Sequence, residues 1–481
     1  MQLRQLIAVV LVGISALVGQ VETACQAART NFLLITVDDM NWDSVGAFGC
    51  QVANITPNID RLASQGMRFQ HAHVTIAICQ PTRAVWMTGR YPHRNGALGF
   101  DPISPGVPTL LEALKDAGYF TGILAKVPHV VPTRGKSWDV AVRASDLKVG
   151  RDPNLYYQRS REIIRQATAA KKPFFLMANS QDPHRPFAGS GQEQGRKKNP
   201  KKKKPNSFPG VSRTYKPEEI SVPGFLPDLP EVREEIAQYY TSVHRADEIT
   251  GAVLRALEES GAADNTLVMF LSDHGMPLPF AKTNCWYHST RTPWIVRWPG
   301  TVKAGTYDQM HFVSGIDLAP TVLDAVGLRP LEGSDGRSFL PVLRGESQDG
   351  RDRVFTHINR TAGRKEYPMR AVQTAKFGYI FNGWSDGKTR FKNESQNGLT
   401  MTAMIRMAET DKKLAGRVKH FLYRTQEELY DYENDPDALN NLAENPKYKQ
   451  ELSRLREMLH AHMQATSDPQ SAAIRSRLSK P

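Results

Sequence analysis

The sequence predicts an α/β protein built on a largely parallel sheet. Strand and helix patterns alternate along the chain to about residue 345, as expected of a parallel sheet with helices on its faces. Several strand patterns are continuous apolar runs, which are typical of strands buried on both faces. Ionisable residues recur just after these runs, at the edge where open α/β sheets bind ligands.

The first and the longest elements carry the clearest patterns. The first strand, 32–37 (FLLITV), is a continuous apolar run that ends at a pair of aspartates. The longest helix, 231–260, places Val232 and Ile236 near one face, and Gly261 closes it. The other elements have shorter runs of the same two kinds: helices at 58–65 and 109–117, and strands at 120–124, 173–178 and 266–271.

Beyond residue 345 the pattern changes. The strand patterns become shorter, as at 371–372 and 379–381, and a helix pattern covers 447–465. This change predicts a second, smaller unit. We expect a larger α/β domain, a smaller subdomain and a mobile tail, at 25–345, 346–465 and 466–481.

The N-terminus predicts export. Arg4 precedes an apolar stretch at 6–18, and small residues before Cys25 offer a cleavage site, so 1–24 is expected to be a signal peptide. The alternatives are an uncleaved anchor helix and a lipoprotein, although Glu22 suits a lipobox poorly. No later apolar run reaches the ~18 residues of a membrane span. The mature chain is therefore expected in a periplasmic, secreted or lysosome-like compartment, without a membrane span.

A cysteine motif carries the most specific chemical signal. Cys79, Pro81 and Arg83 stand at Cys-x-Pro-x-Arg spacing, and residues 87–90 (MTGR) extend the pattern. This segment resembles the signature of the type I, formylglycine-dependent sulfatases. In that family the motif directs a maturation enzyme to oxidise the cysteine to formylglycine. Thr82 stands where serine is commoner, and it keeps the hydroxyl.

The resemblance extends from about residue 31 to residue 446. It implies an alkaline-phosphatase-like α/β sandwich with a central, mostly parallel sheet and a small C-terminal antiparallel subdomain. It also implies a formylglycine derived from Cys79 and one bound calcium ion. The larger domain, 25–345, would then be the catalytic domain of an enzyme that acts on a sulfated saccharide.

Acidic residues after two strands are the candidate metal ligands. Asp38, Asp39 and Asp273 offer carboxylate oxygens, which hard cations such as calcium prefer. The resemblance implies that they bind calcium together with residue 79. His274 stands at a position that is asparagine in many members of the family, and imidazole is a less natural calcium ligand than oxygen.

Sulfate remains anionic throughout hydrolysis, so its site must supply positive charge. Arg83, Lys126 and Lys282 are the candidate cations, and Lys282 stands where the most similar members carry arginine. His184, after the strand at 173–178, is the candidate general acid. His129 is the candidate base, but it lies one residue later than in the family's Gly-Lys-x-His motif, whose glycine is Ala125 here.

Three segments resemble the N-sulfoglucosamine sulfohydrolase (sulfamidase) branch of the family: 181–185, 278–284 and 367–373. A sulfated amino sugar is therefore the expected substrate. Arg185 or Arg370 would hold a neighbouring carboxylate, and Asp182 would accept hydrogen bonds from sugar hydroxyls.

Other functions remain open at this point. An O-sulfated glycan is the alternative substrate within the family. A phosphatase or phosphodiesterase of the same superfamily is disfavoured by the intact Cys79 motif and the scarcity of histidine ligands. A non-catalytic polyanion-binding protein would leave the joint presence of Cys79, Arg83 and His184 unexplained.

The formal net charge of +13 is concentrated in one place. About half of it lies at 196–204 (RKKNPKKKK), within a low-complexity loop expected at 191–205. This run is either a solvated loop or an attractor of polyanions. A sulfated glycan suits an exported protein better than nucleic acid does, and no nucleic-acid-binding motif lies nearby.

Overall fold

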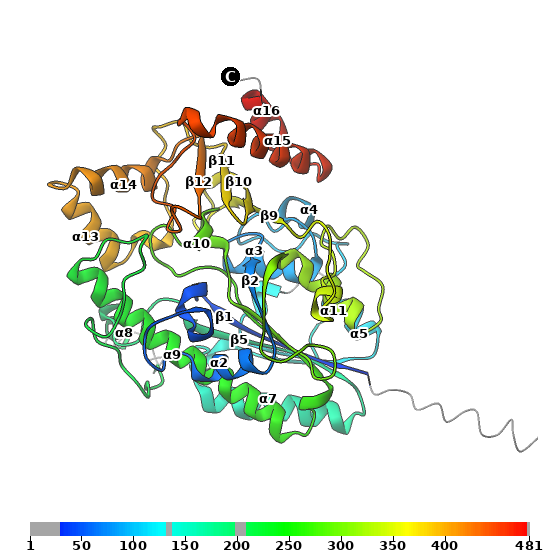
Figure 1. The fold of residues 1–481 in the computed structure, drawn as a ribbon. Coiled ribbons are helices and arrows are strands. Elements are labelled where there is room, and N and C mark those ends of the chain that lie inside the picture. Colours follow the sequence, from blue (N-terminus) through cyan, green and yellow to red (C-terminus); the bar gives the residue numbers. More distant parts are fainter. Residues whose placement is uncertain (1–28, 131–136, 198–207, 479–481) are drawn as a thin grey trace, which may run out of the picture.

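The computed structural model describes residues 29–130, 137–197 and 208–478 (Figure 1). They form a mostly parallel eight-stranded sheet and a separate antiparallel four-stranded sheet. The predicted signal peptide at 1–24, Cys25 and the basic residues at 198–204 lie outside the described residues.

The large sheet has the order β4-β3-β5-β1-β6-β7-β2-β8. Its strands are β1 (Asn31–Asp38), β2 (Met67–His73), β3 (Phe120–Leu124), β4 (Val140–Val142), β5 (Phe174–Pro183), β6 (Thr266–Ser272), β7 (Trp294–Arg297) and β8 (Thr306–Ser314). Only β7 runs antiparallel to its neighbours. Every residue of β1 is buried because it lies between β5 and β6 at the centre of the sheet, which explains its unbroken apolar sequence.

Helices cover both faces of this sheet (Figure 1). The helices α2, α7 and α9 pack together on one face, and α3, α5 and α11 gather on the other. Their bounds, with those of the shorter helices of this domain, are α2 (Pro57–Ser64), α3 (Cys79–Thr88), α4 (Pro92–Asn95), α5 (Leu110–Asp116), α6 (Val127–Val130), α7 (Pro153–Ala169), α8 (Gly191–Lys197), α9 (Pro230–Glu259), α10 (Tyr287–Thr290), α11 (Leu318–Ala325) and α12 (Leu340–Leu343). The predicted α/β sandwich is confirmed.

The second sheet has the order β12-β11-β10-β9. Its strands are β9 (Arg353–Arg360), β10 (Glu366–Thr374), β11 (Phe377–Asn382) and β12 (Glu427–Asp431), and its helices are α13 (Leu399–Met407), α14 (Lys412–Tyr423), α15 (Lys449–Ala465) and α16 (Ser471–Leu478). The buried residues Leu455 and Leu459 of α15 share an apolar cluster with Tyr379 of β11. The predicted antiparallel subdomain is therefore confirmed, with longer strands than expected.

Two expectations about loops need correction. The expected tail is ordered through Leu478: α16 buries Ile474, and Asp468 is 4% exposed. The expected loop at 191–205 begins as α8, because Ser190 accepts a hydrogen bond from the backbone of Glu193 at the start of the helix. Among the described residues, no helix has the length and apolar content that a membrane crossing needs.

Candidate active site

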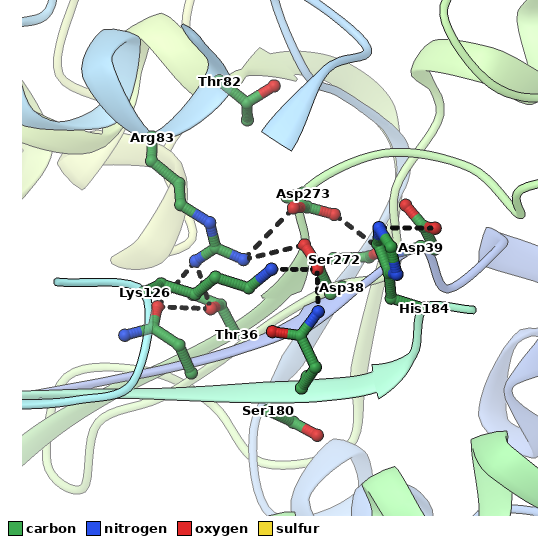
Figure 2. Close-up of polar contacts among 12 residues, drawn as sticks. Thr36, Asp38, Asp39, Thr82, Arg83, Lys126, Ser180, His184, Ser272 and Asp273 are labelled. Carbon is green, nitrogen blue, oxygen red and sulfur yellow. Dashed lines mark hydrogen bonds and ion pairs between the residues drawn. The ribbon is translucent and has the colours of Figure 1, made fainter. Parts of the chain in front are cut away.

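The predicted site residues converge at the carboxyl edge of the large sheet. Asp38 is the last residue of β1 and Asp39 follows it, Asp273 follows β6, and Lys126 follows β3; Figure 2 shows these side chains together with Arg83 of α3. His184 follows β5 on the same edge. Because β3, β5, β1 and β6 are neighbours and parallel, their carboxyl ends bring residues that lie far apart in the sequence into one cluster.

Arg83 anchors this cluster to the sheet. It lies one turn after Cys79 in α3 and is fully buried. Its Nη1 donates to Thr36 Oγ1 at 2.7 Å, and its Nη2 lies 3.1 Å from Asp273 Oδ2 and 3.4 Å from Asp38 Oδ1 (Figure 2). The guanidinium therefore bridges the ends of β1 and β6.

Lys126 and Asp38 form a second buried ion pair. Lys126 and the preceding Ala125 both have positive φ angles, 51° and 57°, so the chain turns sharply at the end of β3. Burial by itself would raise the pKa of Asp38, but Lys126 and a hydrogen bond with Asp273 hold it well below its usual range. Burial and the Asp38 carboxylate raise the pKa of Asp273.

The arrangement around Asp39 tests whether a cation fits. His274 Nδ1 donates to the carbonyl of Gly275 at 3.0 Å, which leaves Nε2 without a proton. That bare Nε2 lies 3.1 Å from Asp39 Oδ1, and both atoms are buried with no hydrogen-bond partner. Two such acceptors repel each other unless a cation lies between them, so these residues fit a metal ion.

Two groups of ligand atoms meet the spacing of a metal site. The first joins Asp38, Cys79 and Asp273, and the second joins Asp39, Asp273 and His274; within each group the ligand atoms lie within 4.8 Å of one another. Asp273 belongs to both groups, so the five residues form one candidate metal site. Three carboxylates in this set suit a hard divalent cation.

Cys79 lines a cavity of about 310 Å³. The cavity is lined by Ile78, Cys79, Phe100, His184, Lys282, Thr283, Thr361, Ala362, Gly363, Lys392, Asn393 and Glu394. Burial and the Asp38 carboxylate raise the pKa of the Cys79 thiol to about 12. An unmodified thiol here would stay protonated and would be a poor nucleophile at neutral pH.

Lys282 projects from the loop before α10 and lines this cavity. Its Nζ lies 2.8 Å from Asp39 Oδ2 and 2.8 Å from Glu394 Oε2. Burial would lower the pKa of Lys282, but the two carboxylates raise it well above its usual value. The ammonium is therefore charged and faces the same cavity as Cys79.

His184 has a defined orientation in the cavity. Its Nδ1 lies 2.6 Å from the carbonyl of Arg185, to which it donates. Its Nε2 faces Asp39 Oδ2 at 4.0 Å and Glu394 Oε1 at 3.6 Å. The backbone bond fixes the ring so that Nε2 points toward the carboxylates of Asp39 and Glu394.

His129 lies in α6, beside the cavity rather than in its lining. Its ring meets Phe100 edge-on, with centroids 5.8 Å apart. Burial and the Lys126 charge lower the pKa of His129 to about 3, and its Nδ1 is buried without a hydrogen-bond partner. The ring is therefore neutral near pH 7, and the lowered pKa makes it a weak base.

The expected substrate-binding roles of Asp182 and Arg370 need correction. Asp182 is fully buried and is held between Arg151 and Arg245. Arg370 is 1% exposed and pairs with Asp468 in the C-terminal subdomain. Buried side chains with internal partners are not available to a sugar. Sequence alone does not distinguish such structural ion pairs from substrate-binding residues.

Arg185 also has a partner within the protein. Its Nη1 lies 2.5 Å from Glu235 Oε1, and its Nη2 donates to the carbonyl of Pro277 at 3.1 Å. Arg185 does not line the cavity, but its charge helps to lower the pKa of Glu394. Arg185 therefore lies outside the lining of the cavity.

Glu394 is the site residue that the sequence analysis missed. It belongs to a 3-10 turn at Glu394–Gln396 in the C-terminal subdomain and contacts both Lys282 and His184. Burial would raise the pKa of Glu394, but Lys282 holds it well below its usual range. No motif marks this glutamate, and only the packing of the two subdomains brings it into the cavity.

The fold and the motif-bearing cavity are those of a sulfatase. The sulfatase family model matches residues 30–328, and a second model, described as "N-sulphoglucosamine sulphohydrolase, C-terminal", matches residues 273–386. The chain belongs to the sulfatase family, whose members generally use formylglycine and calcium.

Similarity to particular proteins runs nearly the whole length of the chain. It is 32% identical to the N-sulphoglucosamine sulphohydrolase of Homo sapiens, over 92% of each chain. It is 26% identical to an ulvan-active sulfatase of Formosa agariphila, over 92% of this chain and 76% of that protein. Among solved structures, a 2-O GAG sulfatase has a TM-score of 0.68 at 22% identity, over 92% of this chain and 93% of that one.

Proposed function

We propose that this protein hydrolyses the N-sulfate of a terminal N-sulfoglucosamine, using formylglycine at position 79 and one calcium ion. The observation that carries the proposal is the 32% identity to the human N-sulphoglucosamine sulphohydrolase over 92% of both chains. The C-terminal match at residues 273–386 supports it, since this region contains Lys282 and the cavity residues Thr361 to Gly363.

Asp38, Asp39, Asp273, His274 and residue 79 would hold the calcium. When bound, calcium and the hydrated formylglycine together supply an acidified hydroxyl nucleophile for attack on sulfur. The buried carboxylates and the paired acceptors Asp39 Oδ1 and His274 Nε2 support this assignment.

Three cations orient the sulfate. Lys282 reaches the cavity directly, while Arg83 and Lys126 approach from the sheet edge through their contacts with Asp38 and Asp273. Positive charge held rigidly in a buried site stabilises the charge that builds up on sulfate oxygens in the transition state. Ion pairing within the protein keeps these side chains in place before substrate arrives.

His184 donates a proton to the leaving group. Its Nδ1 donates to the Arg185 carbonyl, so the proton that it transfers is the second proton of the imidazolium form, on the Nε2 that faces Glu394. His129, held neutral beside Phe100, is the proposed proton acceptor for release of sulfate.

Glu394 favours a nitrogen leaving group. Hydrolysis of an N-sulfate releases an amine, which becomes an ammonium ion near neutral pH, whereas hydrolysis of an ester releases a neutral alcohol. A carboxylate 3.6 Å from the proton-donating Nε2 of His184 stabilises the cation but offers the alcohol no such ion pair. Glu394 Oε2 is already paired with Lys282, so Oε1 is the oxygen that would meet the ammonium, and this supports the sulfamidase assignment.

An O-sulfated glycan is the second candidate. The curated relatives include two ulvan-active sulfatases at 26% identity and a delta 4,5-hexuronate-2-O-sulfatase at 25%. Either substrate agrees with export of the chain by the predicted signal peptide at 1–24.

The deciding experiment compares turnover of three substrates: N-sulfoglucosamine, glucosamine 6-sulfate and 4-nitrophenyl sulfate. The protein is co-expressed with a formylglycine-generating enzyme and assayed with calcium. We expect the highest kcat/KM on N-sulfoglucosamine. Preference for either ester refutes the sulfamidase assignment alone, and no turnover of any sulfate by fully modified protein would favour the non-catalytic polyanion binder.

A further inference from the structure

A second cluster of metal-ligating side chains lies outside the active site, where the two subdomains meet. His93 comes from α4, His357 from β9, and Asp468 from the segment between α15 and α16. One ligand atom from each residue lies within 4.8 Å of the other two. These residues contribute to none of the steps proposed for sulfate hydrolysis.

The distances are close to those of a tetrahedral zinc site. Asp468 Oδ2 lies 3.6 Å from His357 Nδ1 and 3.9 Å from His93 Nδ1. With metal–ligand bonds of 2.0–2.1 Å, two ligand atoms of a tetrahedron are roughly 3.3 Å apart. Movements of a few tenths of an ångström at these two contacts would therefore suffice.

The hydrogen bonds leave the necessary ring nitrogens free. His93 Nε2 donates to the carbonyl of Thr466 at 2.9 Å, so Nδ1 carries a lone pair directed at Asp468. His357 is fully buried, and among the described residues neither of its ring nitrogens has a hydrogen-bond partner. Buried polar atoms without partners are uncommon in native proteins, and a bound ion accounts for His93 Nδ1 and His357 Nδ1.

Asp468 is held in one orientation. Its Oδ1 accepts from Arg370 Nη2 at 3.0 Å and from the backbone of Gln470 at 2.8 Å, while its Oδ2 accepts only from Arg370 Nε at 2.5 Å. The second lone pair of Oδ2 remains free on the side of the histidines. Hydrogen bonds to the other positions of a ligating carboxylate are typical of the outer shell of metal sites.

We propose that His93, His357 and Asp468 bind a zinc-type divalent cation, with water as the fourth ligand. Two imidazoles and one carboxylate suit zinc better than calcium, which prefers oxygen ligands. The ion would link α4 of the larger domain to β9 and to the segment before α16. Its role is structural, because it joins the C-terminal segment to the catalytic domain.

The test is titration of zinc alone into the full chain. The protein carries no histidine tag, is stripped with a chelator and is returned to saturating calcium, so that the catalytic ligands are occupied. Calorimetry should give one zinc equivalent, and the melting temperature should rise with zinc but not with additional calcium. His93→Gln should weaken zinc binding at least tenfold and abolish the rise, while leaving the Asp468–Arg370 pair intact.

His71→Gln is the matched control. His71 is also a buried histidine with an unpartnered Nδ1, but it stacks on Phe312 and has no part in the cluster. It should bind zinc as the wild type does. Zinc-edge X-ray absorption of the wild type, which depends on no variant, should show two imidazoles and oxygen at about 2.0 Å. Absence of a zinc equivalent, unchanged affinity in folded His93→Gln, or a first shell without imidazole would overturn the proposal.

Discussion

Charges of opposite sign alternate among the active-site residues. The carboxylates of Asp38 and Asp39 are each paired with a lysine, and Arg83 bridges Asp38 to Asp273. No charge in this buried cluster stands far from an opposite one, which limits the cost of burying it. The same pairing holds the lysines and the arginine at the positions where a sulfate would need them.

Substitution of Cys79 tests the proposed nucleophile. Cys79→Ala should lower kcat on any sulfate by at least about a thousandfold, since loss of a nucleophile has costs of that order or more. Cys79→Ser should be nearly as inactive, because a serine hydroxyl cannot supply the second hydroxyl of a hydrated aldehyde. Mass spectrometry of the tryptic peptide should find the aldehyde or its hydrate only in the active wild type. Full activity in Cys79→Ala would contradict the proposal.

Calcium removal tests the metal site through stability as well as activity. A ligand at a hundred times its dissociation constant stabilises a protein by about 2.7 kcal/mol, so chelation should lower the melting temperature and abolish turnover. Calcium should restore both. Asp273→Asn should be inactive, and its melting temperature should no longer respond to calcium. If the wild type stays active after exhaustive chelation, it is not a metal enzyme.

Glu394→Gln tests leaving-group selection. The amide keeps the shape of the side chain but cannot pair with an ammonium, so kcat/KM on N-sulfoglucosamine should fall by about ten- to a hundredfold. Turnover of 4-nitrophenyl sulfate should change much less. The ratio of kcat/KM on N-sulfoglucosamine to kcat/KM on 4-nitrophenyl sulfate is measured in one preparation, so it does not depend on the formylglycine content. An equal loss on both substrates would mean that Glu394 acts only by holding Lys282.

The sequence predicted the site residues that lie at the ends of strands, but it did not predict Glu394, which lies elsewhere. Asp38 is the last residue of β1, and Lys126, His184 and Asp273 stand just beyond the ends of their strands, so a parallel sheet gathers them. Glu394 reaches the cavity from the other subdomain, 112 residues from its partner Lys282. No local pattern encodes a contact of that kind.

At the scale of elements, strand β12 supports the loop that carries Lys282. Glu428 of β12 is fully buried and accepts hydrogen bonds from Trp286 at 2.8 Å and from Arg424 at 2.6 Å. Arg424 also donates to Asn284, two residues after Lys282. The small sheet is therefore a support for the catalytic loop.

Glu428→Ala should disrupt this support. It leaves Arg424 buried without its carboxylate, at a cost of about 3–5 kcal/mol in the free energy of unfolding. Urea denaturation measures the loss, and a lower kcat on 4-nitrophenyl sulfate should accompany it if the loop carrying Lys282 shifts. Glu433→Ala, which removes an exposed partner of Lys376, is the control and should change stability by less than about 1 kcal/mol. Equal losses of stability in Glu428→Ala and Glu433→Ala would refute the idea that Glu428 supports the loop carrying Lys282.

The stability that the Glu428–Arg424 ion pair contributes depends on pH. Burial would raise the pKa of Glu428, but Arg424 holds it well below its usual range. A depressed pKa contributes stability above the unfolded-state value of about 4.3, and that stability is lost as the pH falls through the folded-state pKa. The gap in stability between wild type and Glu428→Ala should therefore narrow as the solution is acidified below about pH 4.

Central elements were predictable and peripheral ones were not. The strands β1, β5 and β6 contain continuous apolar runs and β3 is a short, mostly buried strand. Their predicted ends hold to within one residue, except that β5 continues beyond its predicted end at 178 to Pro183. The strands β2, β7 and β8 were not predicted, since they lie toward one side of the sheet and include polar or exposed positions. Periodicity weakens where one face of a strand meets solvent.

At the scale of the whole molecule, the C-terminal segment is part of the fold. Asp468 pairs with the buried Arg370, and α16 buries Ile474. Truncation after Ala465 leaves Arg370 without its carboxylate and should lower the free energy of unfolding by about 3–5 kcal/mol. Thermal melting and limited proteolysis measure the effect. Removal of residues 479–481 is the control, and a tolerated truncation after Ala465 would show that the segment is dispensable.

The burial of α3 limits when the proposed oxidation of Cys79 can take place. Every residue from Cys79 to Thr88 except Gln80 is buried, including Pro81 and Arg83. A maturation enzyme that recognises this motif cannot bind it after the chain has folded, because the motif is then buried. The proposed conversion must therefore take place on the nascent or unfolded chain. Under the proposed mechanism, a molecule that folds before oxidation stays inactive, and the active fraction of a preparation reports how well oxidation competes with folding.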